Sequence, residues 1–512
     1  MSVPATSLPS EAPDLLVLAP LSVEASAVRA GAPWARVHRI GMGPRRATRS
    51  AKLVPGAAGS AVLIAGFCGA LDPELQPGDV VLATELRGPT GTTVCDDTAI
   101  LAGVLRRGGL NVRCGPIASS QRLVLRERRR ALHRSGALAV DMESAWLAPV
   151  MGGAPLVTLR VVMDTPRHEL HHPLRTVAAA AVAYRTLRRA CELVHDWAQA
   201  LGPREIVLAS PRASCAGVDR AVEVVERVLE ERGAPIYVRK QIVHNAHVVT
   251  ALEERGAIFV EELGEVPEGA TVIFSAHGVS PAVRTEAVAR KLDVIDATCP
   301  LVSKVHAEAR RFAAGGFDIV LVGHESHEEV EGTSGEAPEH THVIASAEEV
   351  ARLEVEDPSR VAYLTQTTLA VDDTAEVVDG LRARFPGLVG PASSDICYAT
   401  QNRQDAVRAL ADECNLVLVV GSVNSSNSRR LVEVSERAGC PALLVEDGSS
   451  IPPERLVGAR RIGLTAGASA PEALVEGVVS ALAGLGKVET SERSVAREEV
   501  RFRLPPEVRQ RR

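Results

Sequence analysis

The chain has 512 residues, too many for one compact core, which predicts two or three domains. Apolar residues make up 46% and charged residues 24%, as in an ordinary globular protein, and the formal net charge of −7 argues against nonspecific binding of nucleic acid or anionic membranes. No apolar run reaches the ~20 residues of a membrane-spanning helix, and residues 1–13 lack the features of a signal peptide, so we expect a cytoplasmic protein with a disordered leader.

The first part of the chain reads as alternating strands and helices. Its predicted strands are 15–19, 61–65, 80–83 and 156–162. Continuous apolar runs of this length between helical patterns indicate an α/β sheet that is covered on both faces. A helical stretch over 178–201 follows, and Gly202-Pro203 breaks it. We therefore predict one domain over residues 14–200 and another over residues 204–512.

The second part contains a coarse repeat, in which an apolar strand leads to a loop with one cysteine and then to a helix. The strands are predicted at 206–209, 294–296 and 395–396, the cysteines are Cys215, Cys299 and Cys397, and the helices are predicted at 218–231, 302–312 and 402–413. Three α/β modules of about ninety residues each could surround a pseudo-threefold axis. Their cysteine loops would then meet at the centre.

Cysteine chemistry leaves several interpretations open for these three residues. Most cysteines in a reducing compartment are inert buried thiols, and Cys68 and Cys414 fit that description. Cys215, Cys299 and Cys397 each precede a helix, whose N-terminus lowers the pKa of a thiol and donates hydrogen bonds to sulfur. Zinc usually binds closely spaced Cys/His pairs, which are absent, whereas three cysteines could hold an iron–sulfur cluster with one open iron. Spacing alone does not separate a cluster from a zinc-binding structural site.

Polar loops follow six of the predicted strands. They are His244-Asn245, 275–280, His324 with His327, 365–368, 425–428 and 466–469. One such loop would be an ordinary cap or turn, but six near three cysteine loops indicate a shared cavity suited to phosphate oxygens. No P-loop is present. Glu329 is the candidate proton donor, with a solvated acidic loop at Glu328, Glu329 and Glu331 as the alternative.

The chain resembles the 4-hydroxy-3-methylbut-2-enyl diphosphate reductase family from about Arg204 to Pro506. The matching segments include Cys-Ala-Gly-Val-Asp-Arg at 215–220, Phe-Ser-Ala-His-Gly-Val-Ser at 274–280, Asp-Ala-Thr-Cys-Pro-Leu-Val at 296–302, Thr-Gln-Thr-Thr-Leu at 365–369, Asp-Ile-Cys-Tyr-Ala-Thr at 395–400 and Asn-Ser-Ser-Asn-Ser at 424–428. The resemblance implies an iron–sulfur oxidoreductase with three α/β modules around a central cluster.

The resemblance also implies a role for each site residue. Cys215, Cys299 and Cys397 would hold one 4Fe–4S cluster per chain, and its fourth iron would bind the substrate hydroxyl. The diphosphate would be bound by His244, His277, His327, Ser425, Ser426, Asn427 and Ser469. Glu329 would relay protons, and Thr367 would lie beside the hydroxyl. A ferredoxin- or flavodoxin-type partner would supply electrons to convert the allylic diphosphate into isopentenyl and dimethylallyl diphosphates, the last step of the non-mevalonate isoprenoid pathway.

One segment departs from the family pattern. Before the first cysteine the family usually has Arg-Gly-aromatic, and here the residues are Arg212-Ala213-Ser214. Alanine adopts a positive φ less readily than glycine, and serine removes an aromatic cover from the cluster. A catalytically inactive diphosphate- or redox-sensing regulator is the alternative function. Glu329 and Thr367 argue against it, because a pure binding protein needs neither.

Residues 14 to about 195 resemble the nucleoside phosphorylase and nucleosidase family. Gly41-Met42-Gly43, residues 66–71 and Val140-Asp141-Met142-Glu143-Ser144 carry the resemblance. It implies that Glu143 binds ribose hydroxyls, Met142 packs on the sugar, Asp164 protonates the leaving purine and Glu24 activates water. The hopanoid-associated nucleosidases, which act on adenosylhopane, are the variant that comes nearest. Met163 stands where the family commonly has serine. The alternative is a degenerate domain that only packs or regulates.

Overall fold

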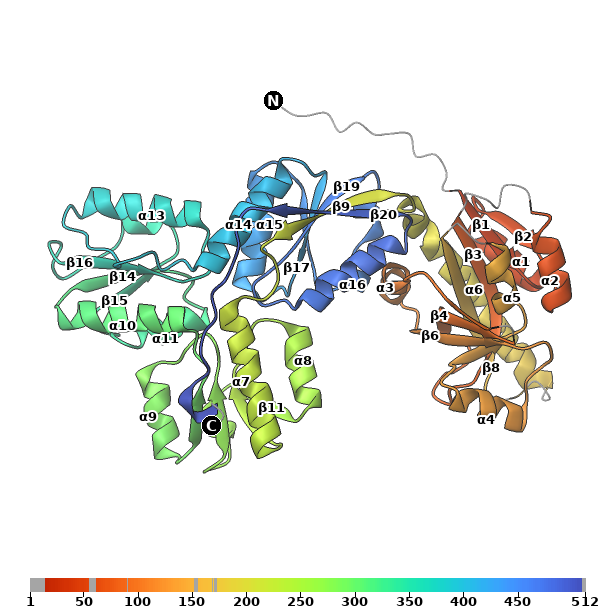
Figure 1. Cartoon of the computed structure of the whole chain (residues 1–512), viewed down its shortest axis with the longest axis horizontal. Coiled ribbons are helices and arrows are strands. Elements are labelled where there is room, and N and C mark those ends of the chain that lie inside the picture. Colours follow the sequence, from red (N-terminus) through yellow and green to blue (C-terminus); the bar gives the residue numbers. More distant parts are fainter. Residues whose placement is uncertain are drawn as a thin grey trace. The chain divides into compact units, whose positions relative to one another are not determined.

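The computed structural model describes residues 14–54, 61–89, 91–151, 155–167, 169 and 173–508, so the expected disordered leader lies outside the described residues. The chain forms two compact units (Figure 1). The first contains the N-terminal part up to Glu205 with Asp447–Arg460 and Glu476–Glu489, and the second contains Ile206–Glu446, Arg461–Val475 and the residues from Thr490 onward. No described helix is long and apolar enough to cross a membrane.

The first unit is an α/β structure, as predicted. Its strands are β1 (Leu15–Ala19), β2 (Arg36–Arg39), β3 (Ala61–Ala70), β4 (Val80–Gly88), β5 (Gly91–Val94), β6 (Val112–Ser119), β7 (Ala139–Asp141) and β8 (Leu156–Asp164). Its helices are α1 (Ser22–Gly31), α2 (Pro44–Ala51), α3 (Ala99–Arg107), α4 (Arg126–Arg134), α5 (Ser144–Leu147), the 3-10 turn η1 (Ala148–Val150) and α6 (Pro173–Gln199). All four predicted strands and the long helix are present.

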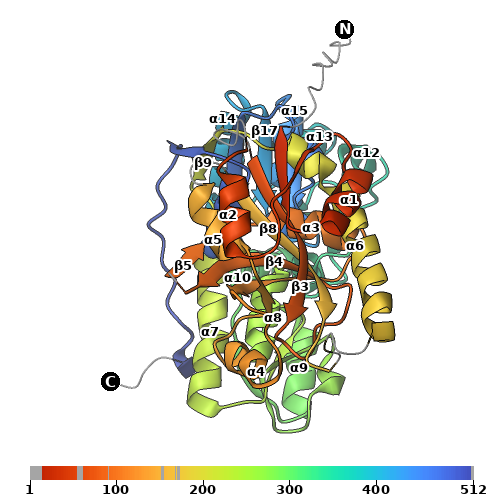
Figure 2. The same cartoon turned by 90° about the vertical axis from the view of Figure 1, so that its right-hand side faces the viewer.

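The sheet of the first unit closes on itself. Its strand order is β2-β1-β3-β7-β6-β4-β5, and β8 pairs with both β3 and β4, so five strands form a closed circuit. Helices α1 and α6 pack together, and α2 packs with α5 on another side of the sheet (Figure 2). Leu16, Leu18 and Ile64 of the sheet contact Ala47 and Ala51 of α2 in one buried cluster. Helices thus cover the apolar sheet, as its continuous apolar strands require.

The second unit contains three sheets, which we call the first, second and third modules. The first module has strands β10 (Ile236–Arg239), β11 (Ala257–Val260), β12 (Thr271–Phe274) and β13 (Asp293–Asp296). The second has β14 (Asp318–Val322), β15 (Thr341–Ile344) and β16 (Val361–Thr365), and the third has β9 (Arg204–Ser210), β17 (Leu416–Val420), β18 (Ala442–Val445), β19 (Arg461–Ala466) and β20 (Val488–Ser494).

Helices and 3-10 turns connect these strands. They are α7 (Ala216–Arg232), α8 (Ala246–Glu254), η2 (Leu263–Glu265), α9 (Pro281–Ala289), α10 (Pro300–Ala314), α11 (Glu328–Ser334), α12 (Ala347–Val350), α13 (Val371–Arg384), α14 (Tyr398–Ala411), α15 (Ser426–Arg437), η3 (Gly448–Ser450), η4 (Pro453–Leu456), α16 (Glu472–Ala483) and η5 (Pro506–Val508).

The three modules share one strand order. Each module contains three strands that follow one another along the chain, and the first of these three lies between the other two, giving β11-β10-β12, β15-β14-β16 and β18-β17-β19; these pairs are all parallel. The carboxyl ends of parallel strands lie at one edge of a sheet, where α/β folds bind ligands. Each module therefore presents two loops at that edge, and these are the six polar loops recognised in the sequence.

The repeat differs from the prediction at one strand. Residues 395–396 are not a strand, so that expectation was wrong. In the second module the place beside β16 is taken by a single bridge between Ala362 and Val389, made by two backbone hydrogen bonds of Val389. Moreover, β9 belongs to the third module, beside β19 and β20, although it comes first in the chain. The order of elements along the chain therefore predicted the repeat, but not which strands pair with one another.

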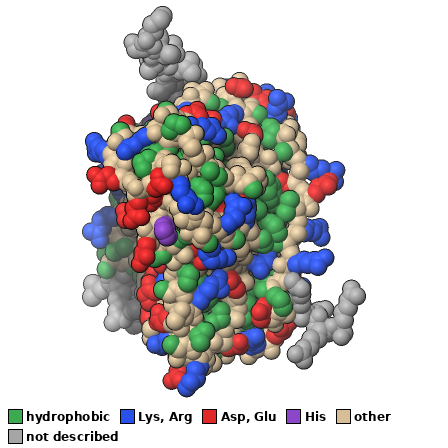
Figure 3. Space-filling model, turned by 90° about the vertical axis from the view of Figure 1, so that its left-hand side faces the viewer, with side chains coloured by type: hydrophobic (Ala, Val, Ile, Leu, Met, Phe, Trp, Pro, Cys, Tyr) green, Lys and Arg blue, Asp and Glu red, His purple; other side chains and the backbone are tan. Residues whose placement is uncertain are grey.

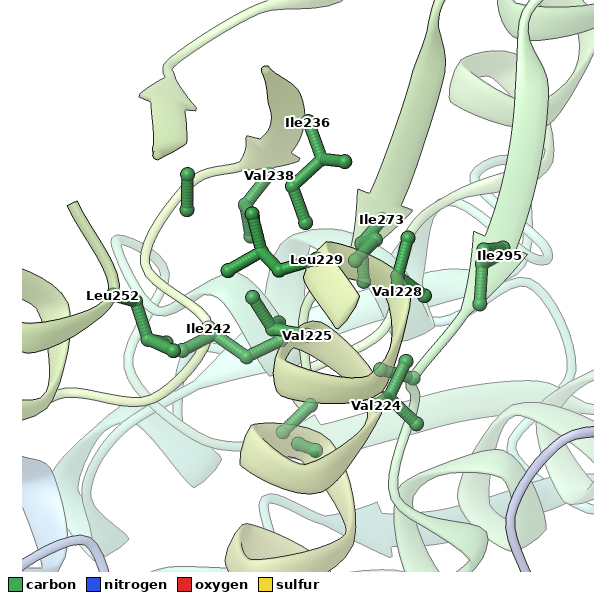
Figure 4. Close-up of a cluster of buried hydrophobic side chains, with 14 of the residues drawn as sticks. Val224, Val225, Val228, Leu229, Ile236, Val238, Ile242, Leu252, Ile273 and Ile295 are labelled. Carbon is green, nitrogen blue, oxygen red and sulfur yellow. The ribbon is translucent and has the colours of Figure 1, made fainter. Parts of the chain in front are cut away.

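Each helix that follows a cysteine packs on the next module. In Figure 4, Val224, Val225 and Val228 of α7 contact Ile273 and Ile295 of the first module. Helix α10 packs in the same way on the second module, and α14 packs on the third. Every cysteine loop is therefore a crossing between two modules, which brings the three loops together.

On the face shown in Figure 3, acidic, basic and apolar side chains are intermixed, so no single charge dominates this surface.

Candidate functional site: a cysteine-lined cavity

Each of the three cysteines is the N-cap residue of a helix. Cys215 precedes α7, Cys299 precedes α10 and Cys397 precedes α14. Each backbone N–H donates to a carbonyl oxygen in the loop after β12, β16 or β19: Cys299 to Ala276 at 3.0 Å, Cys397 to Thr367 at 3.1 Å and Cys215 to Ala468 at 3.1 Å. The same hydrogen bond therefore fixes each cysteine at the carboxyl edge of a sheet.

These cysteines open onto one cavity. Its volume is about 100 Å³, well above the ~10–15 Å³ that one water molecule needs. All the residues predicted for the reductase site line it, namely Cys215, Cys299, Cys397, His244, His277, His327, Glu329, Thr367, Ser425, Ser426, Asn427 and Ser469. The structure thus brings together residues that are spread over about half of the chain.

The sulfur atoms suit a metal cluster. Burial raises the pKa of Cys299 to about 12, and the nearby Cys215 and Cys397 act in the same direction. Burial and Cys215 likewise raise the pKa of Cys397 to about 11. Three thiols that oppose one another's ionisation are stable as thiolates only with a cation between them. Thr400 already donates its N–H to the Cys397 sulfur at 3.3 Å, with its hydroxyl 3.1 Å from the same atom.

Gly217 leaves the space that such a cluster needs. A Cβ atom at this position would lie 2.7 Å from the Cys299 sulfur and 3.8 Å from the Cys215 sulfur. The first distance is shorter than any ordinary contact, so a side chain here would displace a sulfur. The cavity therefore depends on glycine at the first turn of α7, and the residues present fit a cluster.

We expect the Gly217→Ala variant to bind less iron, because its methyl group would push the Cys299 sulfur away from the other two. Iron and sulfide content after anaerobic purification would measure this. Gly264→Ala is the matched control, since a Cβ there meets no atom within 4 Å. Equal iron content in the two variants would contradict the expectation.

Three imidazoles form a cluster beside the cysteines. The rings of His244 and His277 are stacked, with centroids 4.1 Å apart, and His327 lies edge-on to both, at 5.6 and 5.9 Å. Burial lowers the pKa of His244 to about 3, with His277 acting in the same direction, and burial also lowers the pKa of His327. Without an anion, these two rings are therefore neutral near pH 7.

Hydroxyl and amide groups line the cavity beside the imidazoles. The Ser469 hydroxyl donates to the carbonyl oxygen of His244 at 3.0 Å, and Ser425 caps helix α15. Both side-chain atoms of Asn427 and Nδ1 of His244 are buried and have no hydrogen-bond partner among the described residues. Buried polar atoms are seldom left without partners, so these groups indicate a missing polar ligand.

Glu329 and Thr367 form a direct pair. The Glu329 carboxylate accepts the N–H of Thr367 at 3.0 Å and its hydroxyl at 2.9 Å. Glu329 is only 6% exposed, which excludes the alternative of a solvated acidic loop for this residue. Its own N–H donates to Nδ1 of His327 at 3.2 Å. A buried carboxylate is thereby joined to a hydroxyl at the cavity wall, as a proton relay requires.

The departure at Ala213-Ser214 has a visible consequence. Ala213 has a φ of +58°, the conformation that glycine adopts more readily. Its carbonyl oxygen accepts two hydrogen bonds from the buried guanidinium of Arg403, at 2.7 and 3.1 Å, and Arg403 also pairs with Glu498 at 2.9 Å. Tyr398 and Phe502 supply aromatic lining in the cavity, although position 214 does not.

We expect Ala213→Gly to stabilise the second unit slightly. A positive φ costs a residue with a side chain ~1–2 kcal/mol, which glycine avoids. Glycine also has more freedom in the unfolded chain, and this opposes the gain by ~0.4–1 kcal/mol. A net gain of about 0.5–1 kcal/mol should raise the melting temperature of the anaerobic protein. In the control, Ala251→Gly, the residue is exposed inside helix α8 and the same change should destabilise. Destabilisation by both changes would contradict this account.

In the first unit, Glu24 and Glu143 lie around Arg160. The Glu24 carboxylate accepts the N–H groups of Leu21 and Phe67, both at 2.6 Å. Glu143 accepts the N–H of Gly43 at 2.9 Å and lies 3.7 Å from the Arg160 guanidinium. Burial raises the pKa of Glu143 to about 7, against the effect of Arg160. The hydrogen bond between Gly43 and Glu143 joins the Gly41-Met42-Gly43 loop to the predicted ribose-binding segment.

Asp164 has a different neighbour. It ends β8 and forms a buried ion pair with Arg129 of α4. Burial raises its pKa, and Arg129 opposes this. Met142, the fourth predicted residue of this unit, is half-buried. Sequence reasoning missed Arg129 and Arg160, although an arginine within the apolar run of β8 needs buried partners and was a usable signal.

Comparison with known proteins identifies the class. Residues 206–483 match the model of the LytB protein family, and the chain belongs to this family. Its relatives include the 4-hydroxy-3-methylbut-2-enyl diphosphate reductases of Nocardia farcinica, 59% identical over 60% of this chain and 91% of the relative, and of Bordetella pertussis, 58% identical over 59% and 93%. The resemblance recognised in the sequence is thereby confirmed.

A solved structure and a second family model complete the comparison. The E-1-hydroxy-2-methyl-but-2-enyl-4-diphosphate reductase from Plasmodium falciparum superposes with a TM-score of 0.58 at 39% identity, over 60% of this chain and 97% of that one. Residues 23–197 match the Phosphorylase superfamily model. The α/β fold class predicted for both parts is confirmed.

Proposed function

We propose that residues 204–512 form a domain that reduces 4-hydroxy-3-methylbut-2-enyl diphosphate to isopentenyl and dimethylallyl diphosphates. The convergence of three N-cap cysteines, three imidazoles and the Glu329–Thr367 pair on one cavity carries this proposal. The relatives that bear this activity in their names support it. The reaction consumes two electrons and two protons and releases the hydroxyl group as water.

Some of these residues would bind the cluster or the substrate, and others would supply protons. Cys215, Cys299 and Cys397 would hold the 4Fe–4S cluster, which supplies electrons and binds the substrate hydroxyl when present. His244, His277, His327, Ser425, Ser426, Asn427 and Ser469 would bind the diphosphate and satisfy the unpaired atoms of His244 and Asn427. Glu329 would hold the proton that leaves with the hydroxyl group, and Thr367 would orient that carboxylate. A ferredoxin- or flavodoxin-type protein would supply the electrons.

Anaerobic purification with iron and sulfide analysis tests this proposal, followed by an assay of substrate consumption with a chemical reductant. A brown protein that forms both isoprenyl diphosphates is the expected result. A brown protein that binds diphosphate without turnover would favour the inactive regulator. A colourless protein after anaerobic reconstitution would overturn the proposal.

A second function is proposed for residues 14–200, namely nucleoside hydrolysis. The contact of Glu143 with Gly43 favours it, because it joins two segments through which the chain resembles nucleosidases. Glu24 would activate water, Met142 would pack on the sugar and Asp164 would protonate the base after separating from Arg129. Release of free base from a panel of purine nucleosides tests this, with Glu143→Gln as the inactive control. No release from any nucleoside would favour a packing or regulatory domain.

A further inference from the structure

A carboxylate that the proposed reaction does not use holds one imidazole of the site. Oε2 of Glu328 lies 2.9 Å from Nδ1 of His277, and both side chains are largely buried. We propose that Glu328 is a positioning residue that keeps the Nδ1–H of His277 on its carboxylate and favours the charged ring, whose Nε2–H then donates to the diphosphate. This inference rests on the proposed function and deepens it, because it names the group that makes anion binding depend on pH.

The geometry singles out His277 among the three rings. His244 stacks on it, and Nδ1 of His244 is buried without a partner among the described residues. Nδ1 of His327 accepts a backbone N–H from Glu329, so it is not a proton donor there. Of these three rings, only His277 has a carboxylate oxygen within hydrogen-bond distance in the described part of the chain. A carboxylate beside an imidazole fixes its tautomer and stabilises its charged form.

Charge explains why one ring must carry a proton. The charged and titratable side chains that act on the neighbouring rings of His244 and His327 are Lys240 from the loop after β10, and His324, Glu328 and Glu329 from the loop after β14 and α11. The Ser275 hydroxyl lies 3.5 Å from Nδ1 of His277, and His306 of α10 lies close to Gly278. Burial lowers the pKa of His244 and His327, so neither ring offers positive charge near pH 7.

Glu328 itself stays ionised. Burial acts to raise its pKa, but the hydrogen bond and charge of His277 outweigh that and lower it to about 2. Among the three rings, His277 is the one whose added proton would face a carboxylate oxygen, at 2.9 Å. When Nδ1–H points to the carboxylate, the neutral ring leaves Nε2 bare, which repels an anion. Only the protonated ring can donate from Nε2.

The pH dependence follows with a definite sign. Affinity should be highest where His277 is protonated and should fall as rising pH removes that proton. A carboxylate beside an imidazole favours its charged form over its neutral form. Replacing Glu328 by glutamine should therefore leave affinity almost unchanged at low pH. At high pH it should weaken affinity about tenfold or more, because less of the ring is charged.

The test measures inorganic diphosphate binding to the anaerobic full-length holoprotein, for the wild type, Glu328→Gln, Glu328→Asp and Glu325→Gln. Glu325 is the matched control, because it is exposed on the same loop and makes no hydrogen bond within the described residues. The quantity compared is the ratio of variant Kd to wild-type Kd at each pH, in which the titration of diphosphate itself cancels.

For Glu328→Gln this ratio should rise from about one at low pH to about ten or more at high pH, with partial rescue in Glu328→Asp and a flat ratio in Glu325→Gln. A ratio above one that is constant with pH would show a merely structural role and overturn the inference. A ratio below one would show that Glu328 repels the anion, which also overturns it. If the wild type binds no diphosphate at any pH, the proposed function fails instead.

Discussion

Replacing Cys299 by serine is expected to remove the cluster, with iron and sulfide falling roughly tenfold or more and reductase turnover falling with them. Cys299 caps α10, and its sulfur lies beside Gly217, between the first and second modules. Serine is a harder and far less acidic ligand than cysteine, so two thiolates would remain for four irons. Iron analysis and the visible absorption of the anaerobic protein measure the loss.

Cys414→Ser is the matched control for this change. Cys414 belongs to the same unit, packs near Gly463 and does not line the cavity. It should keep its iron and its activity. A Cys299→Ser protein that retains the full cluster would show that another side chain supplies the third ligand, and the assignment of Cys215, Cys299 and Cys397 would have to be abandoned.

Replacing Glu329 by glutamine is expected to lower turnover by about 10²–10⁴-fold while the cluster stays intact. The glutamine amide has the size of the carboxylate and can still accept the N–H of Thr367, so the loop should keep its structure. The amide cannot hold the proton that the leaving hydroxyl requires. Single-turnover kinetics of the reduced protein, with iron analysis alongside, separates this effect from loss of the cluster.

Two further variants sharpen the interpretation. Thr367→Val keeps the backbone N–H that binds Glu329 and removes only the hydroxyl, so its loss should be smaller than that of Glu329→Gln. Glu325→Gln, on the same loop but exposed, should keep full turnover. Full turnover in Glu329→Gln would refute the proton role and leave Glu329 as a purely structural partner of Thr367.

The local part of the fold could be predicted from the sequence. Apolar runs and helix starts are local signals, which is why strands such as Leu15–Ala19 and helices such as α7 were found within a few residues. Strand pairing is not local. Nothing around Ile206 indicates that β9 lies beside β19, and a single bridge at Val389 leaves no apolar run to recognise.

The cavity was predictable for a related reason. Cys299, His277 and Thr367 all lie just after strands, and parallel sheets collect such positions at one edge. Residues that act through others left weaker signals. Glu328 reads as part of an acidic loop, and Arg403 reads as a charged residue on a helix until its contacts with the loop before Cys215 are seen. Their importance comes from burial, which composition does not reveal.

The position of β9 has a consequence for how the protein is made. This strand and Cys215 leave the ribosome more than two hundred residues before β19 and β20, which flank β9 in the finished sheet. Contacts of such long range form late and slowly. The first and second modules can fold during synthesis, whereas β9 remains an unpaired apolar strand until β19 and β20 have been made. We therefore expect the proposed cluster to be inserted only after β19 and β20 have been made, and we expect the nascent protein to be most open to aggregation and to chaperones before that point.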